Sequence, residues 1–406
     1  MAVAGLRGTG DWATDERPKN FREMILWRQP NGMAPLTALM AKMKKETTDD
    51  PEFSWYEEEL APIRVQVNYT TGYATTVTNI VVDGGDALDF VAGDILLAEA
   101  AEGTTFADEL LTVVAAGSAT ALTITRGTAN TTPATLANDM YLTKIGNAFA
   151  EGTTSPTSST RNPTKLTNYC QILKTTYELT NTALQTNTRT GDPKQNDKKR
   201  KMFDHSIAME LAFLFGKKYE TTGSNGKPLR YTGGLLNFLA TGTTGRVDAA
   251  TAMVGSTGIN TLLDTIYPVF DYNSASGAGD ERIVFAGNGA LNALNKACKA
   301  AGDVTFGEVV KVYGMNLTKL VTPQGTLYFK SHPLMNVNTR FTNSMFIIDP
   351  TAIKYRPLRN RDTKFQDNIQ ANDADTNKGQ WISEVGVEFN HMKTMMYLGA
   401  VSWSAT

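Results

Sequence analysis

The sequence is poor in the residues that build metal sites, covalent cross-links and histidine-based catalytic centres. Two cysteines among 406 residues, Cys170 and Cys298, cannot form a disulfide framework or a four-thiolate metal site. The three histidines, His205, His332 and His391, lack the spacing of metal ligands. We interpret both cysteines as small buried hydrophobic residues, and we predict no metal and no cofactor.

Long apolar runs and an excess of one charge are also missing. No run approaches the roughly 18 apolar residues of a membrane span. The 39 Lys and Arg against 41 Asp and Glu leave a formal net charge of −2, whereas dedicated nucleic-acid or membrane-surface binders carry a clear basic excess. Residues 1–14 lack the apolar segment of a signal peptide. We therefore expect a protein that stays in the cytoplasm, or in something assembled there, without a membrane partner.

The motifs of common enzymes are absent or incomplete. We find no phosphate-binding P-loop, no serine-hydrolase elbow and no zinc-protease helix. Gly287-Asn288-Gly289 follows a predicted strand and opens a predicted helix, as a dinucleotide-binding turn does, but Asn292 stands where the third glycine belongs. A tight strand–helix connection is the preferred interpretation. An α/β enzyme with a β-accessory domain stays open as an alternative.

Threonine is abundant in one region, with 24 of the 87 residues from 104 to 190. This β-branched residue favours strands. Short β segments separated by glycine-containing turns predict a small closed or nearly closed β-module at about residues 72–147. The predicted strands are 76–82, 94–98, 109–114, 121–126 and 140–145.

The same region is acidic. Residues 65–155 contain ten acidic groups and two basic ones, Arg126 and Lys144, so their net charge is −8 and the rest of the chain carries about +6. Such an asymmetry can guide how copies or partners meet. A solvated surface module is the plainer interpretation.

Residues 1–60 have the pattern of an arm, in which isolated large side chains alternate with glycine, proline and charged residues. The segment 35–45 is its one predicted helix. Three of the five tryptophans lie in this arm, and large aromatics anchor interfaces, so docking on a neighbouring chain competes with packing on its own domain. The candidate inter-subunit residues are Trp12, Phe21, Trp27 and Trp55 of the arm, with Arg126 and Lys144 of the β-module.

The strongest predicted helix covers residues 193–219. Asp192 suits the N-cap and Pro193 the first helical position, and Gly223 is the expected stop. At about 1.5 Å per residue this helix would span about 40 Å. Its apolar stripe is formed by Phe203, Ile207, Leu211 and Leu214 and widened by Met202, Met209, Phe213 and Phe215.

A basic cluster, Lys198, Lys199, Arg200 and Lys201, lies in the N-terminal half of that helix. A solvated helix face is the plainer interpretation of such a run. Contact with nucleic acid or with an acidic neighbour is the alternative.

The remaining chain predicts a mixed α/β region over 224–345 and mixed strands after it. A linker is predicted at 150–163, and a strand at 169–180 would return the chain from the module. The other predicted elements are a helix at 259–270, a strand at 282–286, a helix at 290–301, a hairpin of 317–321 with 326–330, and strands at 345–348, 353–356, 381–389 and 395–401.

In this order the parts resemble the major capsid proteins of tailed bacteriophages with the HK97-type fold, in particular the group typified by a podovirus with an elongated head. The resemblance covers nearly the whole chain. It is carried by 231–239 (YTGGLLNFL), 283–291 (IVFAGNGAL), 325–329 (GTLYF), 346–350 (FIIDP) and 381–390 (WISEVGVEFN), while 93–96 (GDIL) and 122–127 (LTITRG) are similar to a β-module that some members insert.

The resemblance implies an α+β fold with five parts. These are an N-terminal arm (1–60), an extended loop with the inserted module (61–190), a spine helix with the start of a peripheral domain (191–235), an axial domain (236–345) and C-terminal peripheral strands (346–406). It implies a structural protein of the virion, assembled in the bacterial cytoplasm, and not an enzyme.

The resemblance also implies partners. Hexamers and pentamers of the chain would enclose double-stranded DNA through weak contacts, with a separate scaffold protein, a portal and, in some relatives, a decoration protein. Some members cross-link a loop lysine to a neighbour; the module here offers only Lys144, so we expect non-covalent locking, with the acidic module as a candidate clamp. Another virion protein, such as a tail, adhesin or decoration component, is the nearest alternative.

Overall fold

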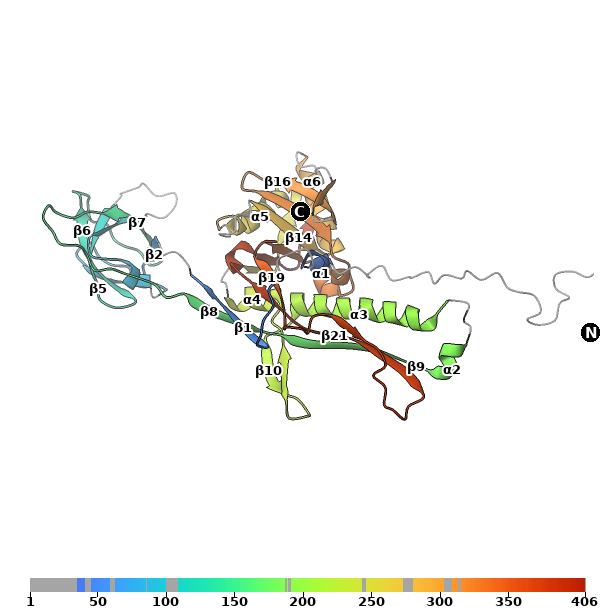
Figure 1. The fold of residues 1–406 in the computed structure, drawn as a ribbon. Coiled ribbons are helices and arrows are strands. Elements are labelled where there is room, and N and C mark those ends of the chain that lie inside the picture. The colour runs from blue at the N-terminus through green and yellow to red at the C-terminus, as the bar shows by residue number, and fades with distance from the viewer. Residues whose placement is uncertain are drawn as a thin grey trace, which may run out of the picture. The chain divides into compact units, whose positions relative to one another are not determined.

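The computed structural model describes residues 35–40, 45–58, 63–84, 86–99, 109–186, 188, 191–242, 246–272, 280–302, 309–312 and 315–405. The fold is mixed α+β, and the chain divides into two compact units (Figure 1). One unit comprises residues 56–166, here called the barrel unit. The other comprises residues 1–55 and 167–406, here called the main unit. The chain passes between them in β1 (Glu52–Glu57) and β8 (Thr164–Tyr169), which pair as a two-stranded sheet.

The barrel unit is a six-stranded antiparallel sheet in the order β2-β7-β4-β5-β6-β3. Val67, directly after β2, bridges Val82, directly after β3, so the two ends of this order meet and the sheet closes. Fifteen buried residues, among them Ile80, Leu96 and Leu111, fill its interior. The predicted closed β-module is confirmed, with one strand more than expected. Its strands are β2 (Arg64–Gln66), β3 (Asn79–Val81), β4 (Asp94–Ala98), β5 (Glu109–Ala116), β6 (Ala121–Thr128) and β7 (Tyr141–Asn147).

The long helix of the main unit, α3 (Pro193–Phe215), begins as predicted but ends earlier. The Asp192 side chain caps it by accepting a hydrogen bond from the Lys194 amide at 2.8 Å. The helix stops at Gly216, so the predicted continuation to residue 219 and the predicted stop at Gly223 are wrong. A Cβ at Gly216 would lie 2.5 Å from the Thr232 carbonyl oxygen, so the close approach of another segment requires glycine here.

The buried face of α3 differs from the apolar stripe in the sequence. The buried residues are His205, Met209, Glu210, Phe213 and Leu214. In contrast, Phe203 is 52% exposed and Leu211 39%. The buried face is therefore rotated from the predicted apolar stripe and includes two polar residues, His205 and Glu210.

This face packs against a long ribbon, in which β9 (Gln171–Thr180) pairs with β21 (Thr376–Phe389) over ten residues. The strands β19 (Ile353–Pro357) and β20 (Lys364–Gln366) pair with β21 as well. His205 of α3 contacts both strands of this ribbon. Its Nδ1 is 3.2 Å from Thr175 Oγ1 in β9, and its Nε2 contacts Ser383 Oγ in β21. A short helix, α2 (Asn181–Gln185), connects β9 to α3.

A seven-stranded mixed sheet forms the α/β part of the main unit, in the order β12-β22-β18-β14-β17-β16-β15. The helices α5 (Gly258–Ile266) and α6 (Asn288–Ala301) contribute to its core. The strands are β12 (Val247–Asp248), β14 (Glu281–Ala286), β15 (Val309–Val312), β16 (Met315–Val321), β17 (Thr326–Ser331), β18 (Met345–Ile348) and β22 (Met396–Leu398).

Four details of this sheet and its connections bear on the predictions. The hairpin of β16 and β17 and the step from β14 into α6 are confirmed. The C-terminal strand β22 pairs with β18 and β12, so the sheet does not end at the expected division at residue 346. A Cβ at Gly287 would lie 2.2 Å from the Thr342 carbonyl oxygen. The glycine is required by this approach of backbone, which supports the interpretation of a tight connection.

The smaller elements complete the main unit. They are α1 (Pro35–Met40), the hairpin β10 (Tyr219–Thr222) with β11 (Pro228–Tyr231), α4 (Leu235–Gly242), α7 (Thr339–Thr342), and the parallel pair β13 (Ala252–Val254) with β23 (Ser402–Ser404).

Candidate interaction surfaces

The root of the N-terminal segment is held by a buried glutamate of α3. Glu210 is fully buried and accepts hydrogen bonds from the amides of Leu36 at 2.7 Å and Thr37 at 2.6 Å, and also from the Thr37 hydroxyl. Its other neighbour is His332, whose Nε2 lies 2.7 Å away and donates, since a carboxylate only accepts. Leu36 and Met40 of α1 are buried as well. We call Glu210, its partners and these two side chains the α1 anchor.

A second network joins the next part of the segment to β19. Lys45 and Thr48 form parallel bridges to this strand and the residue after it. Glu46 lies 2.9 Å from Arg356 and 3.3 Å from Lys354, and the buried Glu388 pairs with both of these cations. Neither Glu210 nor this network was predicted, because the partners lie far apart in the sequence and no local pattern indicates them.

The aromatic residues predicted at subunit contacts divide into two groups. Trp12, Phe21 and Trp27 lie outside the described residues. Trp55 is 7% exposed; its ring stacks on Phe53 at 6.1 Å and lies 5.9 Å from Phe238. The structure thus places Trp55 within the core of its own unit, which argues against the predicted contact with a neighbour.

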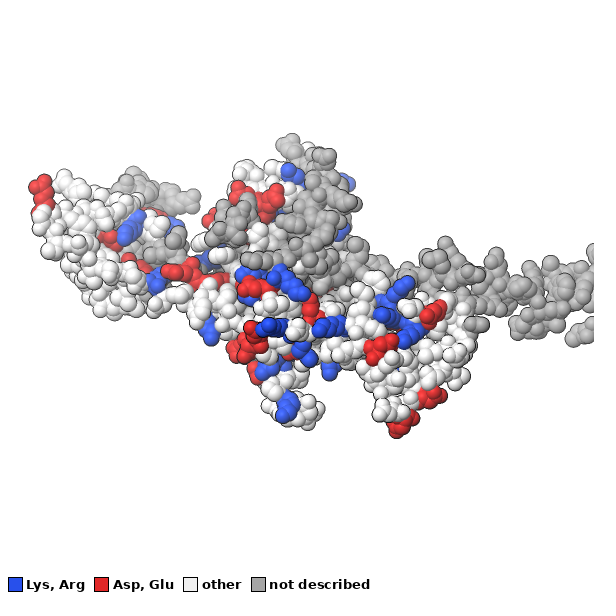
Figure 2. Space-filling model, in the orientation of Figure 1, with Lys and Arg blue, Asp and Glu red and all other residues white. Residues whose placement is uncertain are grey.

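The basic cluster of α3 is not one continuous surface. Lys198 Nζ lies 3.8 Å from the centre of the Phe365 ring, and Lys201 forms an ion pair with Asp204 at 3.2 Å. Lys199 and Arg200 are exposed. In the view of Figure 2, basic and acidic groups are interspersed over the described surface. Lys199 and Arg200 are thus the exposed members of the cluster.

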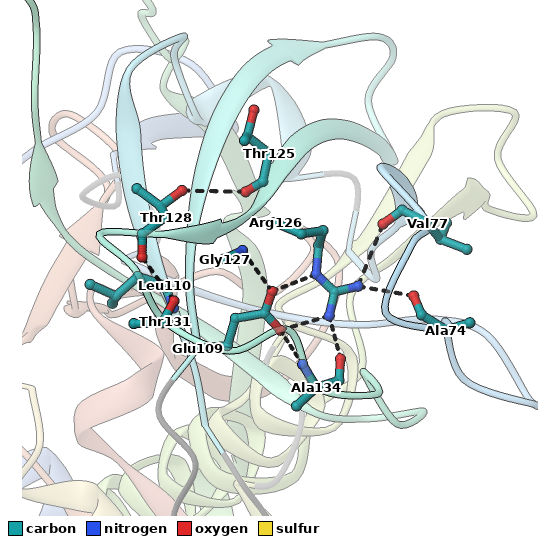
Figure 3. Close-up of polar contacts among 10 residues, drawn as sticks. All are labelled: Ala74, Val77, Glu109, Leu110, Thr125, Arg126, Gly127, Thr128, Thr131 and Ala134. Carbon is teal, nitrogen blue, oxygen red and sulfur yellow. Dashed lines mark hydrogen bonds and ion pairs between the residues drawn. The ribbon is translucent and has the colours of Figure 1, made fainter.

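In the barrel unit, Arg126 is bound internally instead of presenting its charge (Figure 3). Its guanidinium forms a two-pronged pair with Glu109 at 2.7 and 2.6 Å and donates to carbonyl oxygens of Ala74, Val77 and Ala134. The two side chains are 5% and 0% exposed. The contact of Arg126 with a neighbouring subunit stays a prediction, and the burial of this side chain within its own unit argues against it.

The Glu109 carboxylate is equally well satisfied. Besides Arg126, it accepts hydrogen bonds from the amides of Gly127 at 3.1 Å and Ala134 at 2.9 Å. Burial raises the pKa of Glu109, but the hydrogen bonds from Arg126, Ala134 and Gly127 outweigh burial, so the net pKa lies below its usual 4.5. Glu109 therefore stays ionised and ties β5 to β6 and to the loop after it.

Lys144 lies at the rim of a groove of about 980 Å³ in the barrel unit. Its side chain is 33% exposed, and its ammonium pairs with the buried Asp94 at 2.7 Å. Part of this side chain thus remains accessible. The linker passes the same groove, where Arg161 pairs with Asp86 at 2.5 Å and Asp89 at 2.7 Å.

The acidic excess of this region is partly neutralised inside the unit. Five carboxylates each have a basic partner within it, the fifth pair being Glu99 with Arg64. These ion pairs reduce the negative charge that the barrel unit could present to a neighbouring subunit. They therefore argue against a clamp that acts through negative charge alone.

The titratable groups do not form a catalytic centre in the described part of the chain. Burial raises the pKa of Cys170 to about 12 and also raises that of Cys298, so neither is an activated nucleophile. A second pocket of about 550 Å³, between α4 and β22, is lined by no acidic residue, histidine or cysteine. Among the described residues no group of three or more His, Cys, Asp or Glu could hold a metal ion, and no described helix is long and apolar enough to cross a membrane.

A subunit with two separate compact units, an anchored N-terminal segment and no convergent reactive groups in its described residues has the features of a structural assembly protein. Comparison with known proteins supports this class. The family model "SU10 major capsid protein" matches residues 6–402, and the chain belongs to this family. It is a structural subunit of an icosahedral phage head and not an enzyme.

Individual relatives agree with the family. The chain is 26% identical to the major capsid protein of Pseudomonas phage PaMx41 over 349 residues, which are 86% of this chain and 80% of that protein. Its structure is similar to the capsid of a native GTA particle (TM-score 0.49, 9% identity, 97% of this chain and 99% of that one). It is also similar to the capsid of Myoviridae phage XM1 (TM-score 0.48, 8% identity, 98% and 99%).

Proposed function

We propose that this subunit has the HK97-type arrangement and builds hexamers and pentamers around double-stranded DNA. The barrel unit serves as the inserted module of the extended loop, α3 as the spine helix, and the seven-stranded sheet as the core of the axial domain. The sheet of β9, β19, β20 and β21 is the peripheral domain. The observation that carries this proposal is the insertion of a closed barrel between two strands that leave and rejoin the main unit.

We propose that neighbouring subunits are held by the N-terminal arm and by the extended loop without covalent bonds. Lys144 is the only lysine between residues 65 and 155, and its ammonium already pairs with Asp94. Denaturing gels of mature particles should show monomers only. Ladders of covalent multimers would contradict non-covalent locking.

We propose weak contacts to DNA through the exposed Lys199 and Arg200, an elongated head, a separate scaffold protein, a portal and, as a further candidate, a decoration protein. Charge interactions with a polyanion are sequence-independent and sensitive to salt. This fits a chain whose net charge is −2.

The test is electron microscopy with light scattering of the purified chain, expressed with and without the candidate scaffold protein. Shells, capsomer rings or tubes would support assembly through these surfaces. Shells that form equally well without the scaffold would contradict its requirement, and isometric shells alone would contradict the elongated head. A stable monomer under both conditions would contradict this scheme of assembly.

A further inference from the structure

The hairpin of β10 and β11 follows α3 in the chain and projects from the main unit (Figure 1). It is a separate two-stranded sheet, and within the described residues no third strand pairs with it. Its turn is closed by a hydrogen bond of 2.8 Å from the Gly223 amide to the Lys227 carbonyl oxygen. Two-stranded sheets are marginally stable in water by themselves, so a projecting hairpin of this kind gains stability when a surface covers it.

The register places the apolar side chains of the hairpin on one face. Tyr219 lies opposite Tyr231, and Thr221 lies opposite Leu229. Because alternate residues of a strand point to the same side, these four share one face, and Glu220 and Arg230 share the other. The two tyrosine rings are 6.4 Å apart. We call the first of these surfaces the tyrosine face.

The hairpin exposes the apolar side chains of one face, whereas the charged side chains of the other face pair with each other. On the tyrosine face, Tyr219 is 60% exposed, Leu229 43% and Tyr231 40%. On the other face, the Glu220 and Arg230 side chains form an ion pair at 3.5 Å and are less exposed, at 36% and 28%.

Glu220, on the charged face, lies near Tyr169 of the same subunit. Burial and the nearby negative charges of Glu52 and Glu220 raise the pKa of the Tyr169 hydroxyl, which belongs to β8. The charged side chains thus pair with each other, whereas the described residues leave Tyr219, Leu229 and Tyr231 largely exposed. Clustered apolar exposure of this kind marks interaction sites.

We propose that the tyrosine face packs against a second copy of this chain in the assembled shell. A capsid is built of many copies, so a surface that projects from one subunit meets another copy of the same chain. Tyrosine is enriched in interfaces because its ring adds apolar area while its hydroxyl finds a polar partner.

The exposed area of the tyrosine face is smaller than a complete protein–protein interface. From their exposed fractions, the three side chains offer on the order of 300 Å², against about 800 Å² per partner in a standard interface. The tyrosine face therefore contributes one contact among several, alongside the arm and the extended loop.

Thiol labelling distinguishes the two faces. Cys170 and Cys298 are buried, so cysteines introduced by Leu229→Cys and, as the matched control on the opposite face, Thr222→Cys would dominate the reaction with maleimide. In dissociated subunits both should react quickly. In assembled particles the cysteine at 229 should react at least about tenfold more slowly, and the cysteine at 222 within about twofold of its free rate. Unchanged reactivity at 229, or equal protection of both positions, would overturn the proposal.

Photo-cross-linking identifies the covering chain. Particles are assembled from a mixture of ¹⁴N- and ¹⁵N-labelled protein that carries p-benzoylphenylalanine in place of Leu229. Cross-linked peptide pairs of mixed isotope composition would support a second copy. Pairs of uniform composition alone would show that the subunit's own chain covers the face, and cross-links to a different protein would assign it to another partner; either result would overturn the proposal.

Discussion

Each of the two units contains a fully buried glutamate, and the two glutamates differ in how far along the chain their hydrogen-bond partners lie. In the barrel unit, Glu109 binds Arg126, Gly127 and Ala134, which lie 17, 18 and 25 residues along the chain. In the main unit, Glu210 binds Leu36, Thr37 and His332, which lie 174, 173 and 122 residues away.

This difference in separation predicts a difference in independence. Closing a loop costs conformational entropy that grows with its length, so the Glu109 network forms at lower entropic cost. The barrel unit holds its own core and its own buried ion pair. The main unit depends on the N-terminal segment returning to α3, and this couples α1 to the stability of α3.

The largest effect should follow from Arg126→Ala, which leaves the Glu109 carboxylate buried and unpaired. Removing one partner of such a pair costs about 3–5 kcal/mol. Hydrogen exchange in β5 and β6 should rise strongly. All five tryptophans lie outside residues 56–166, so the denaturation midpoint followed by tryptophan fluorescence should stay the same. A large shift of that midpoint would show that the two units unfold together. It would contradict the independence of the barrel unit.

A smaller effect is expected from Glu210→Gln. The amide nitrogen of glutamine cannot accept a hydrogen bond, so at least one donor of the α1 anchor loses its acceptor, at a cost of about 1–3 kcal/mol. The fluorescence midpoint should fall, and the amides of Leu36 and Thr37 should exchange faster while β5 and β6 are unaffected. Glu178→Gln, which alters an exposed ion pair with Lys378, is the control and should leave both readings unchanged. Unchanged exchange at Leu36 and Thr37 in Glu210→Gln would contradict the anchor.

As the pH falls, the main unit should lose stability before the barrel unit does. Burial lowers the pKa of His205 below its usual 6.5, so as the pH falls below 6.5 the unfolded chain binds a proton before the folded one, and the main unit loses stability. The lowered pKa of Glu109 keeps its contribution complete above 4.5, and this contribution is lost only as the pH falls through the folded pKa. Fluorescence midpoints should therefore decline before barrel protection does.

The variant His205→Gln checks the assignment of this pH dependence. Glutamine does not titrate, so the decline of the main unit between pH 6.5 and the lowered pKa of His205 should flatten. A slope that persists unchanged in His205→Gln would assign the acid sensitivity to other groups.

The smallest effect concerns the two thiols, both of which are in the main unit. The thiolate is the reactive form, and burial raises the pKa of Cys170 to about 12 and that of Cys298 as well. Both should react with maleimide only when the main unit opens. Arg126→Ala should not accelerate this labelling, whereas Glu210→Gln should. Rapid labelling of the native wild-type chain would contradict the burial of these residues.

The elements predicted correctly are those defined by neighbours in the chain. Alternation of period two located β4 to the residue and β5, β6 and β7 nearly so. Asp192 and Pro193 marked the start of α3 because capping involves only the first turn.

The end of α3 could not be predicted in this way. The residues from Gly216 to Tyr219 contain no strong helix terminator apart from a single glycine. A Cβ at Gly216 would lie 2.4 Å from the Ala212 carbonyl oxygen and 2.5 Å from that of Thr232, so only glycine fits where the helix ends. Tyr219 then pairs with Tyr231 in the hairpin.

The environment of Arg126 could not be predicted from its neighbours in the chain either. A lone basic residue in an acidic, threonine-rich region has the pattern of a surface group, and Glu109 precedes it by 17 residues in a neighbouring strand. Only the pairing of β5 with β6 brings the two together and buries them.

The sequence by itself therefore determined the type and order of the elements and the resemblance that rests on this order, because hydrophobic period, turn residues and caps act within a few residues. The tertiary structure decided which charges are buried and which apolar side chains are left outside. Glu210 at the α1 anchor and the tyrosine face of the hairpin are the clearest cases. Burial depends on segments that meet from distant parts of the chain, and no local pattern encodes that meeting.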